Sequence, residues 1–295
     1  MYKDGHPPEK GYPLPADIGW QHIQDLVNKN NKNKQAKFLQ NGISATDVVQ
    51  GELGDCWLIS AMSSLASRDN LLVGGIENMD YDNMIVDKSI AAKCSEGVYP
   101  PIFHRYRSRG IYVIRIFKDF KWVYVVIDSR IPVNNTTGLP CFGRCKTEEE
   151  AMAKDPMDAK NIHPTEFWVS LIEKAYAKMH GCYGNLISGY IDEAVQELTG
   201  FQPEKILIRD DRTGVFPHKM VSKNYSFGEK DVADGFWRFL MERFRDRCIM
   251  GCSVKGNGKS GELILDGHPT GLMLNHAYSL MHVWEIRGGV QKNDI

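Results

Sequence analysis

The stretch Gln50 to Leu65 decides the fold and reads Gln-Gly-Glu-Leu-Gly-Asp-Cys-Trp-Leu-Ile-Ser-Ala-Met-Ser-Ser-Leu. Gly51 and Gly54 favour a tight loop, and the apolar residues that follow recur at helical spacing. We therefore predict a helix that begins at Cys56 and is capped by Asp55.

The predicted start of this helix makes Cys56 a candidate nucleophile. Unpaired backbone N–H groups and the positive end of the helix dipole favour a thiolate, the form that attacks carbonyl carbon. Gln50 lies six residues earlier and can fold back to donate an amide N–H to an oxyanion beside the sulfur. A buried structural cysteine under a helix cap is the alternative, and these residues alone leave it open.

Composition argues for an ordinary globular protein. The 295 residues include 36 basic and 37 acidic side chains, so no charge bias favours nucleic acid or an anionic membrane. The lysine-rich run 28–37 lacks interleaved aromatic residues and is typical of a solvated surface. The longest apolar runs, such as 122–127, are too short to cross a bilayer. We expect no nucleic-acid partner and no stable membrane insertion.

The cysteines and the N-terminus indicate a compartment. The seven cysteines are odd in number and show no framework spacing, which suits a reducing environment. Residues 1–15 are polar and proline-rich and do not resemble a secretory signal. The expected location is therefore cytoplasmic.

Periodicity predicts an α+β fold with a helical first half and an antiparallel, β-rich second half. In the first half, strands at 111–117 and 121–132 form a hairpin, and 165–180 is an amphipathic helix. A glycine-punctuated connector ending at Gly189 is a reasonable subdomain boundary. The second half carries two predicted helices and four predicted strands, namely helices 191–198 and 232–244 and strands 205–208, 248–254, 262–265 and 272–286.

A cysteine nucleophile needs a positioned base, which is most often histidine. Of the nine histidines, His276 differs because it lies inside the strand-like run 274–280, where an imidazole would be held rigidly. The residues alone do not decide whether His276 is catalytic.

Several separated motifs together resemble the calpains, the papain-like intracellular cysteine proteases. The segment 50–61 is similar to their Gln-Gly and Gly-Asp-Cys-Trp-Leu nucleophile segment, and 275–280 to their Gly-His-Ala-Tyr-Ser motif. The strand 122–132 resembles their Val-Asp-Asp-Arg-Leu-Pro strand. The stretch 166–200 resembles their Glu-Phe-Trp, Glu-Lys-Ala-Tyr-Ala-Lys and Phe-Thr-Gly run. These motifs occur in the family's order across about residues 38 to 288.

The resemblance implies a papain-like core of two subdomains. An N-terminal arm would occupy 1–37, the helical subdomain with the nucleophile 38–189, and the β-rich subdomain with the histidine 190–295. Cys56 would be the nucleophile, His276 the general base and then acid, and Gln50 the oxyanion donor. Substrates would be proteins, and Gly189 and Asn275 would contact the substrate backbone. Asn275 stands where the family usually has glycine.

The resemblance also implies Ca²⁺ as a cofactor. Matched residue by residue, the first calcium site falls on the carbonyls of Gln40 and Gly42 and the carboxylates of Asp47 and Glu166. Oxygen-only ligands suit this hard cation. Ala45 replaces an arginine that joins the two halves in conventional members, so we expect calcium coupling to be weakened.

The third catalytic residue of calpains is an asparagine followed by Pro-Trp-Gly, which orients the imidazole. No such motif follows His276 before Ile295, and Asn293 is the last asparagine. We therefore expect a chain truncated before the catalytic asparagine and the second calcium site.

The resulting hypothesis is a calcium-dependent intracellular cysteine endopeptidase that carries out limited proteolysis through a thioester. The main alternative is a catalytically impaired calpain-like interaction or regulatory module. A transglutaminase and a zinc scaffold are further rivals, the latter using Cys141 with Cys145 or Cys248 with Cys252. Flanking domains and a regulatory subunit are left open by these residues.

Overall fold

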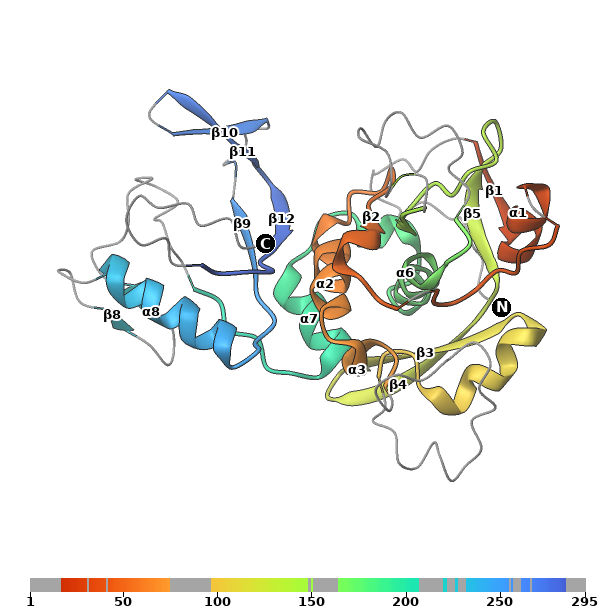
Figure 1. Ribbon diagram of the computed structural model, residues 1–295, viewed down its shortest axis with the longest axis horizontal. Coiled ribbons are helices and arrows are strands. Elements are labelled where there is room, and N and C mark those ends of the chain that lie inside the picture. Colours follow the sequence, from red (N-terminus) through yellow and green to blue (C-terminus); the bar gives the residue numbers. More distant parts are fainter. Residues whose placement is uncertain are drawn as a thin grey trace. The chain divides into compact units, whose positions relative to one another are not determined.

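The computed structural model describes residues 17–30, 32–40, 42–74, 97–147, 150, 164–206, 220–221, 226–227, 232–254, 256, 261–265 and 267–284. Within these residues, helices and antiparallel strand pairs follow one another along the chain, which confirms the α+β class (Figure 1).

The described helices are distributed over the whole chain. The α-helices are α1 (Ile23–Asn30), α2 (Cys56–Ala66), α3 (Asp69–Leu72), α6 (Trp168–Met179), α7 (Ile191–Thr199) and α8 (Val232–Arg245). The 3-10 helices are η1 (Ala45–Asp47), η2 (Pro101–Arg109) and η4 (Tyr183–Leu186). None of the described helices has both the length and the apolar composition that a membrane crossing requires.

The named strands form two-stranded antiparallel sheets. They are β1 (Ile18–His22), β2 (Val48–Val49), β3 (Ile111–Lys118), β4 (Lys121–Asp128), β5 (Arg130–Asn134), β6 (Arg144–Cys145), β7 (Met220–Val221), β8 (Ser226–Phe227), β9 (Gly251–Val254), β10 (Glu262–Leu265), β11 (His268–Met273) and β12 (His276–Ser279). The pairs are β1 with β5, β2 with β6, β3 with β4, β7 with β8, β9 with β12, and β10 with β11.

The predicted hairpin is β3 and β4, joined by Asp119 and Phe120. Both turn residues have positive φ, 50° and 59°, as a two-residue turn that matches strand twist requires. The second predicted strand is divided, because the chain bends at Ser129 and continues as β5, which pairs with β1 instead. The expectation of one strand over 121–132 was therefore wrong in its extent.

Helices α2 and α6 form the centre of the core. Nine of the eleven residues of α2 are buried, so this helix is apolar on nearly every side. The residues of α6 from Trp168 to Ala177 are buried as well. The helix begins at Trp168 rather than at the predicted 165, because Glu166 is extended and bridges to Lys37.

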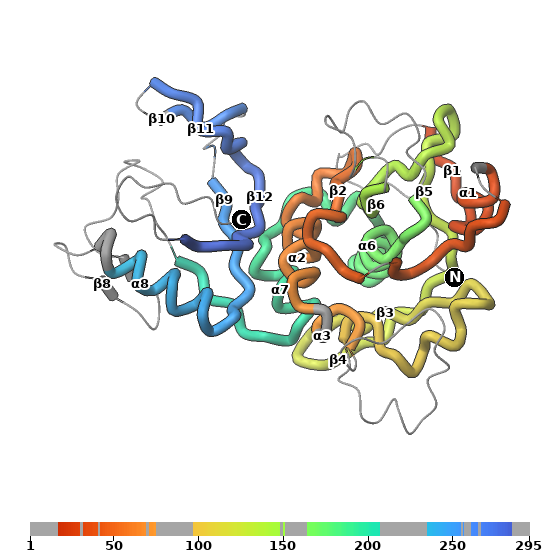
Figure 2. The backbone as a smooth tube through the Cα atoms, in the orientation of Figure 1, coloured from red at the N-terminus to blue at the C-terminus, as the bar shows by residue number. Residues whose placement is uncertain are grey.

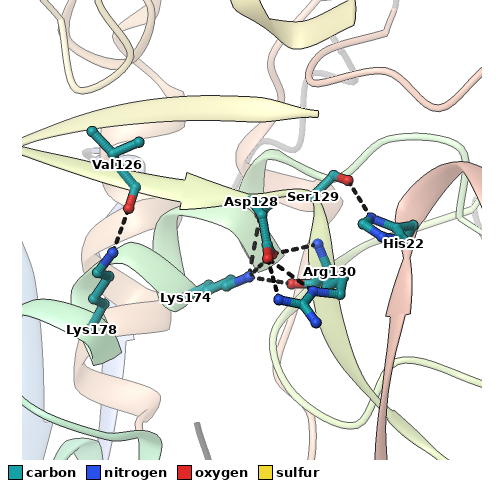
Figure 3. Close-up of polar contacts among 7 residues, drawn as sticks. All are labelled: His22, Val126, Asp128, Ser129, Arg130, Lys174 and Lys178. Atoms are coloured by element: carbon teal, nitrogen blue, oxygen red, sulfur yellow. Dashed lines mark hydrogen bonds and ion pairs between the residues drawn. The ribbon is translucent and has the colours of Figure 1, made fainter. Parts of the chain in front are cut away.

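A buried lysine fixes the corner between β4 and β5 onto α6 (Figure 3). The Lys174 ammonium donates to Asp128 Oδ1 at 2.5 Å and to the Arg130 carbonyl at 2.6 Å. Burial alone would raise the pKa of Asp128, but hydrogen bonds from Arg130 and Lys174 hold it well below its ordinary value. Ion pairs from Lys174 and Arg130 to Asp128 thereby stabilise the corner of the Val-Ile-Asp-Ser-Arg-Ile-Pro segment.

Contacts divide the chain into two compact units. The first comprises 1–203 together with 251–279, and the second 204–250 together with 280–295. The cysteine helix and the histidine strand therefore belong to one unit. The predicted subdomain boundary at Gly189 stays a prediction.

Two strand predictions in the second half differ from the structure. The expected strand 272–286 is interrupted by a turn at Leu274 and Asn275, and 280–284 carries no strand. Asn275 has φ of 58°, which no continuous strand can accommodate. Of the expected strand 205–208, residues 205 and 206 are irregular and the other two lie outside the described residues.

Candidate active site

Cys56 is the first residue of α2, as predicted, and its side chain is partly exposed. The N–H groups of Leu58 and Ile59 donate to the Asp55 carbonyl and close the first turn at 2.9 Å and 3.1 Å. The thiol therefore stands at the positive end of a helix that is otherwise buried. This position favours nucleophilic chemistry.

Asp55 occupies the N-cap position, but the predicted capping role of its side chain was wrong. The carboxyl makes no capping hydrogen bond, and the residue is fully buried. The side chain acts instead on Glu173 of α6, which is 1% exposed.

Asp55, the residue that precedes the candidate nucleophile, forms a buried carboxyl pair with Glu173. Burial raises the pKa of Asp55 to about 6. Burial, and then the nearby Asp55 carboxyl, raise the pKa of Glu173 well above its ordinary value. Glu173 Oε1 also accepts the Gly143 N–H at 2.9 Å. Two adjacent carboxylates do not readily ionise together at a buried site, so the pair keeps a proton at a pH where free carboxyl groups have lost theirs.

Sequence reasoning missed Glu173. Periodicity carried no signal for it, because consecutive residues of a helix point about 100° apart and Glu173 falls opposite the apolar residues that predict the amphipathic helix. A buried acid on a helix requires a partner, and Asp55 is that partner.

Gln50 folds back over the glycine loop, and its role as oxyanion donor stays a prediction. Its amide Nε2 donates to the Leu53 carbonyl at 2.8 Å, three residues before Cys56. The amide carries two N–H groups, and this bond uses one of them. The geometry is therefore compatible with a second bond to an oxyanion.

Gly189 lies against the residue that follows the nucleophile. A Cβ atom at Gly189 would come within 2.3 Å of the Trp57 ring, so only glycine fits there without a shift of the indole. The Trp57 indole donates to the Leu186 carbonyl at 2.8 Å, and Ser188 N–H donates to the Gly54 carbonyl at 3.1 Å. The predicted substrate-binding residue Gly189 is thus held beside the start of α2.

His276 is the first residue of β12, which pairs with β9 and lies against α2 (Figure 2). The Ser60 hydroxyl of α2 donates to the Ala277 carbonyl at 2.8 Å, and the Ser279 hydroxyl donates to the Ser60 carbonyl at 2.8 Å. Ser60 lies one helical turn after Cys56, about 6 Å along the axis. The structure therefore joins the histidine strand to the first turns of the cysteine helix.

Asn275 has a conformational reason to replace glycine. Its φ of 58° is left-handed, a region in which asparagine is tolerated better than other non-glycine residues. Its side-chain Oδ1 accepts the Gly256 N–H at 2.7 Å, and its own N–H donates to the Val254 carbonyl at 2.7 Å. Asn275 thus stabilises the turn that precedes His276.

The predicted calcium ligands come together in part. The Gln40 N–H donates to Glu166 Oε1 at 3.0 Å, and the Thr165 hydroxyl donates to Gln40 Oε1 at 2.8 Å. Glu166 and Asp47 both raise the pKa of the buried Cys145 thiol, so both carboxyl groups lie near it. Gly42 is exposed, with φ of 94°.

The donor chemistry of these four residues fits a hard cation. Burial raises the pKa of Asp47, which is the behaviour of a partly desolvated carboxyl that a cation would stabilise. Carboxylates and backbone carbonyls are the ligands Ca²⁺ prefers.

The rival zinc site finds little support. Burial raises the pKa of Cys141 to about 12 and that of Cys145 well above its ordinary value, whereas zinc binds thiolates. In the part of the chain that the structure describes, no group of three or more His, Cys, Asp or Glu residues could hold a metal ion. Asn293, considered for the orienting role, lies outside the described residues.

Comparison with known proteins identifies the family. The family model described as "Calpain family cysteine protease" matches residues 9–295 of this chain. Calpain-5 of Caenorhabditis elegans is 35% identical over 194 residues, which are 66% of this chain and 24% of that protein. Calpain-A of Drosophila melanogaster is 30% identical over 247 residues, 84% of this chain and 22% of that protein.

A plant relative matches over more of the chain. Calpain-type cysteine protease ADL1 of Oryza sativa subsp. japonica is 27% identical over 272 residues, 91% of this chain and 10% of that protein. The chain thus spans about a quarter or less of the length of these relatives. Because this family model matches nearly all of the chain's residues, the chain belongs to the calpain family of cysteine proteases.

Proposed function

We propose that this chain is the protease core of a calcium-dependent cysteine endopeptidase that performs limited cleavage of proteins. The observation that carries the proposal is the link between α2 and β12. Hydrogen bonds at Ser60 join the helix that begins with Cys56 to the strand that begins with His276. A nucleophile and a base on two rigid, directly connected elements are what acyl transfer requires.

Each residue has a defined role in the proposed reaction. His276 takes the proton of Cys56, and the sulfur forms a bond to the substrate carbonyl carbon while the π electrons move to oxygen. The second amide N–H of Gln50 and the backbone N–H of Cys56 donate to that oxyanion. The C–N bond then breaks, and the departing amine takes the proton from His276.

Hydrolysis of the thioester completes the cycle. His276 removes a proton from water, the resulting hydroxide attacks the thioester carbon, and the C–S bond breaks to release the acid and restore the thiol. Gly189 and Asn275 would contact the substrate backbone, since Gly189 lies beside Trp57 and Asn275 precedes the base.

We propose that the four predicted ligands hold a calcium ion. The contact between Gln40 and Glu166 and the partly desolvated Asp47 support this site. The ion would supply positive charge that neutralises the two carboxylates and fixes the loop 40–47 to the segment before α6.

We also propose a reducing, cytoplasmic location. All six cysteines among the described residues are free thiols, which supports a compartment where disulfides do not persist.

Cleavage of an unfolded protein such as reduced casein tests the proposal. The 295-residue chain is assayed in millimolar calcium and in chelator, with Cys56→Ala as the blank and Cys182→Ala, at another free cysteine, as the matched control. The expected result is cleavage in calcium that Cys56→Ala abolishes and Cys182→Ala retains. No cleavage in either condition would favour the interaction module, and equal cleavage by Cys56→Ala would contradict the role of Cys56. Amine incorporation without cleavage would indicate a transglutaminase.

A further inference from the structure

Two serines connect the cysteine helix and the histidine strand in a reciprocal arrangement. Ser60 donates its hydroxyl proton to the carbonyl of Ala277, and Ser279 donates its hydroxyl proton to the carbonyl of Ser60. Both bonds are 2.8 Å long and span more than 200 residues of sequence. We call this pair of hydrogen bonds the serine clamp.

The clamp lies in a buried environment where its loss has a cost. Ser60 is 8% exposed and Ala277 is 7% exposed, so water cannot readily replace either partner. A serine within a buried apolar helix is unfavourable unless its hydroxyl is bonded, and Ser60 is bonded to a different element rather than to its own helix. The clamp therefore specifies which residues of α2 and β12 face each other.

The clamp is also close to the two reacting side chains in sequence. Ser60 is four residues after Cys56, and Ala277 directly follows His276. On the other edge of β12, β9 approaches α7, where a Cβ atom at Gly251 would come within 2.3 Å of Ile191. The strand is thus supported on one side by β9 and fixed in register to α2 by the clamp.

We propose that Ser60 and Ser279 are positioning residues that set the register of β12 on α2 and so hold His276 in reach of Cys56. This inference rests on the proposed function, because it assigns how the chain assembles the proposed Cys56 and His276 pair. A shift of β12 by one residue would turn the opposite face of the strand toward the helix and remove His276 from the site.

The test measures the reaction of Cys56 with iodoacetamide from pH 5 to pH 10 in the whole chain, in the presence of millimolar calcium. Mass spectrometry of the Cys56 peptide reports this thiol separately from the other cysteines. A thiol paired with an imidazolium reacts in acid, where an isolated thiol does not, so the wild-type rate should show an acidic plateau. The variants are Ser60→Ala, Ser279→Ala, Ser60→Thr and Ser279→Thr.

The matched control is Ser170→Ala. Ser170 is a buried serine on α6 that donates to the Gly143 carbonyl at 2.7 Å. Its replacement by alanine removes a comparable hydrogen bond that does not involve β12. We expect each clamp alanine variant to lower the rate at pH 6 by about three- to tenfold and to leave the rate at pH 10 unchanged. The threonine variants keep a hydroxyl and should restore much of the plateau, and Ser170→Ala should retain it.

Each outcome decides between the two claims. A wild-type profile without an acidic plateau would contradict the proposed function itself. A plateau that survives in Ser279→Ala and Ser60→Ala as well as in Ser170→Ala would overturn the clamp while the proposed function stands. If Ser60→Ala fails to fold, the partly exposed Ser279→Ala carries the decision alone.

Discussion

The carboxyl groups of Glu173 and of Asp55, the residue that precedes Cys56, are buried against each other. Such a pair is stable only while it retains a proton, so its stability must depend on pH. Burial raises the pKa of both groups, which means that the folded chain binds protons that the unfolded chain releases above about pH 4. This contribution is fully present below about pH 4 and is lost as pH rises through the raised pKa values of the folded state, which are about 6 for Asp55 and well above the ordinary range for Glu173.

Glu173→Gln should remove most of this dependence. The glutamine amide can accept from Gly143 through its oxygen and donate to the Asp55 carboxylate through its nitrogen, without a shared proton. The unfolding free energy of the variant minus that of wild type should be larger at pH 8 than at pH 4.5, by on the order of 2 kcal/mol. Urea unfolding at the two pH values measures this difference. The exposed Glu193→Gln is the control, and a difference no larger than in that control would contradict the shared proton.

Asn275 shows how a single backbone angle limits substitution. At φ of 58° a glycine is unstrained, whereas alanine pays the cost of a left-handed conformation. We expect Asn275→Ala to be less stable than Asn275→Gly by about 1 kcal/mol, because both lose the bond to Gly256 and alanine alone adds strain. Thermal unfolding compares the two variants. Equal melting temperatures would mean that the turn before His276 relaxes.

At the scale of the element, α6 holds the corner between β4 and β5 through Lys174 (Figure 3). The lysine side chain is 5% exposed, while that of Asp128 is 39% exposed and also binds Arg130. Removal of the ammonium would take away the hydrogen bonds to the Arg130 carbonyl and to the Asp128 carboxylate. The corner would then keep the bonds between Arg130 and Asp128 and the pairing of β5 with β1, but it would lose its connection to α6 through Lys174.

Lys174→Met should therefore destabilise the chain by about 2 kcal/mol. Lys178→Met is the matched control, since Lys178 lies one turn later on α6 and donates to the Val126 carbonyl at 2.7 Å from an exposed position. We expect the control to change the unfolding free energy by no more than about 0.5 kcal/mol. Denaturant titration of both variants checks this, and equal effects would show that the ammonium at the corner is not special.

Elements that depend on local periodicity were predictable, and those that depend on distant partners were not. The hairpin β3–β4 and helices α2, α6, α7 and α8 follow from apolar spacing within each segment. The role of Asp55 could not be read locally, because capping or burial is decided by Glu173 on another helix. The break at Asn275 was hidden by the apolar residues around it, since a single left-handed residue leaves little trace in composition.

The candidate site follows the same division. Cys56, Gln50 and Gly189 were identified by motif and lie together at the start of α2. The link from α2 to β12 through Ser60 could not be predicted, because it joins residues more than 200 positions apart. Motifs thus identify the candidate reacting groups, and long-range hydrogen bonds determine how they are assembled.

At the scale of the whole molecule, the contacts that form the first unit bring 1–203 and 251–279 together. The proposed calcium ligands Gln40, Asp47 and Glu166 all belong to this unit. A cation that binds only the folded form must stabilise it by mass action. Calcium should therefore act on the unit that contains both candidate catalytic residues.

Millimolar calcium should raise the melting temperature of the wild-type chain, and Asp47→Asn should remove most of this shift. Asp25→Asn, at an exposed acid of α1, is the control that should retain it. Isothermal calorimetry measures the same site directly. A calcium-induced melting-temperature shift, or a heat of calcium binding, that does not depend on Asp47 would contradict the proposed calcium site.

The most direct measurement is stoichiometric labelling by a peptidyl epoxide that targets cysteine proteases, read by mass spectrometry at every cysteine. We predict modification of Cys56 far faster than of Cys248 or Cys252, and loss of that preference in His276→Ala. Labelling of Cys56 at the rate of the other cysteines, or labelling unaffected by the loss of His276, would contradict the claim that the two residues act together.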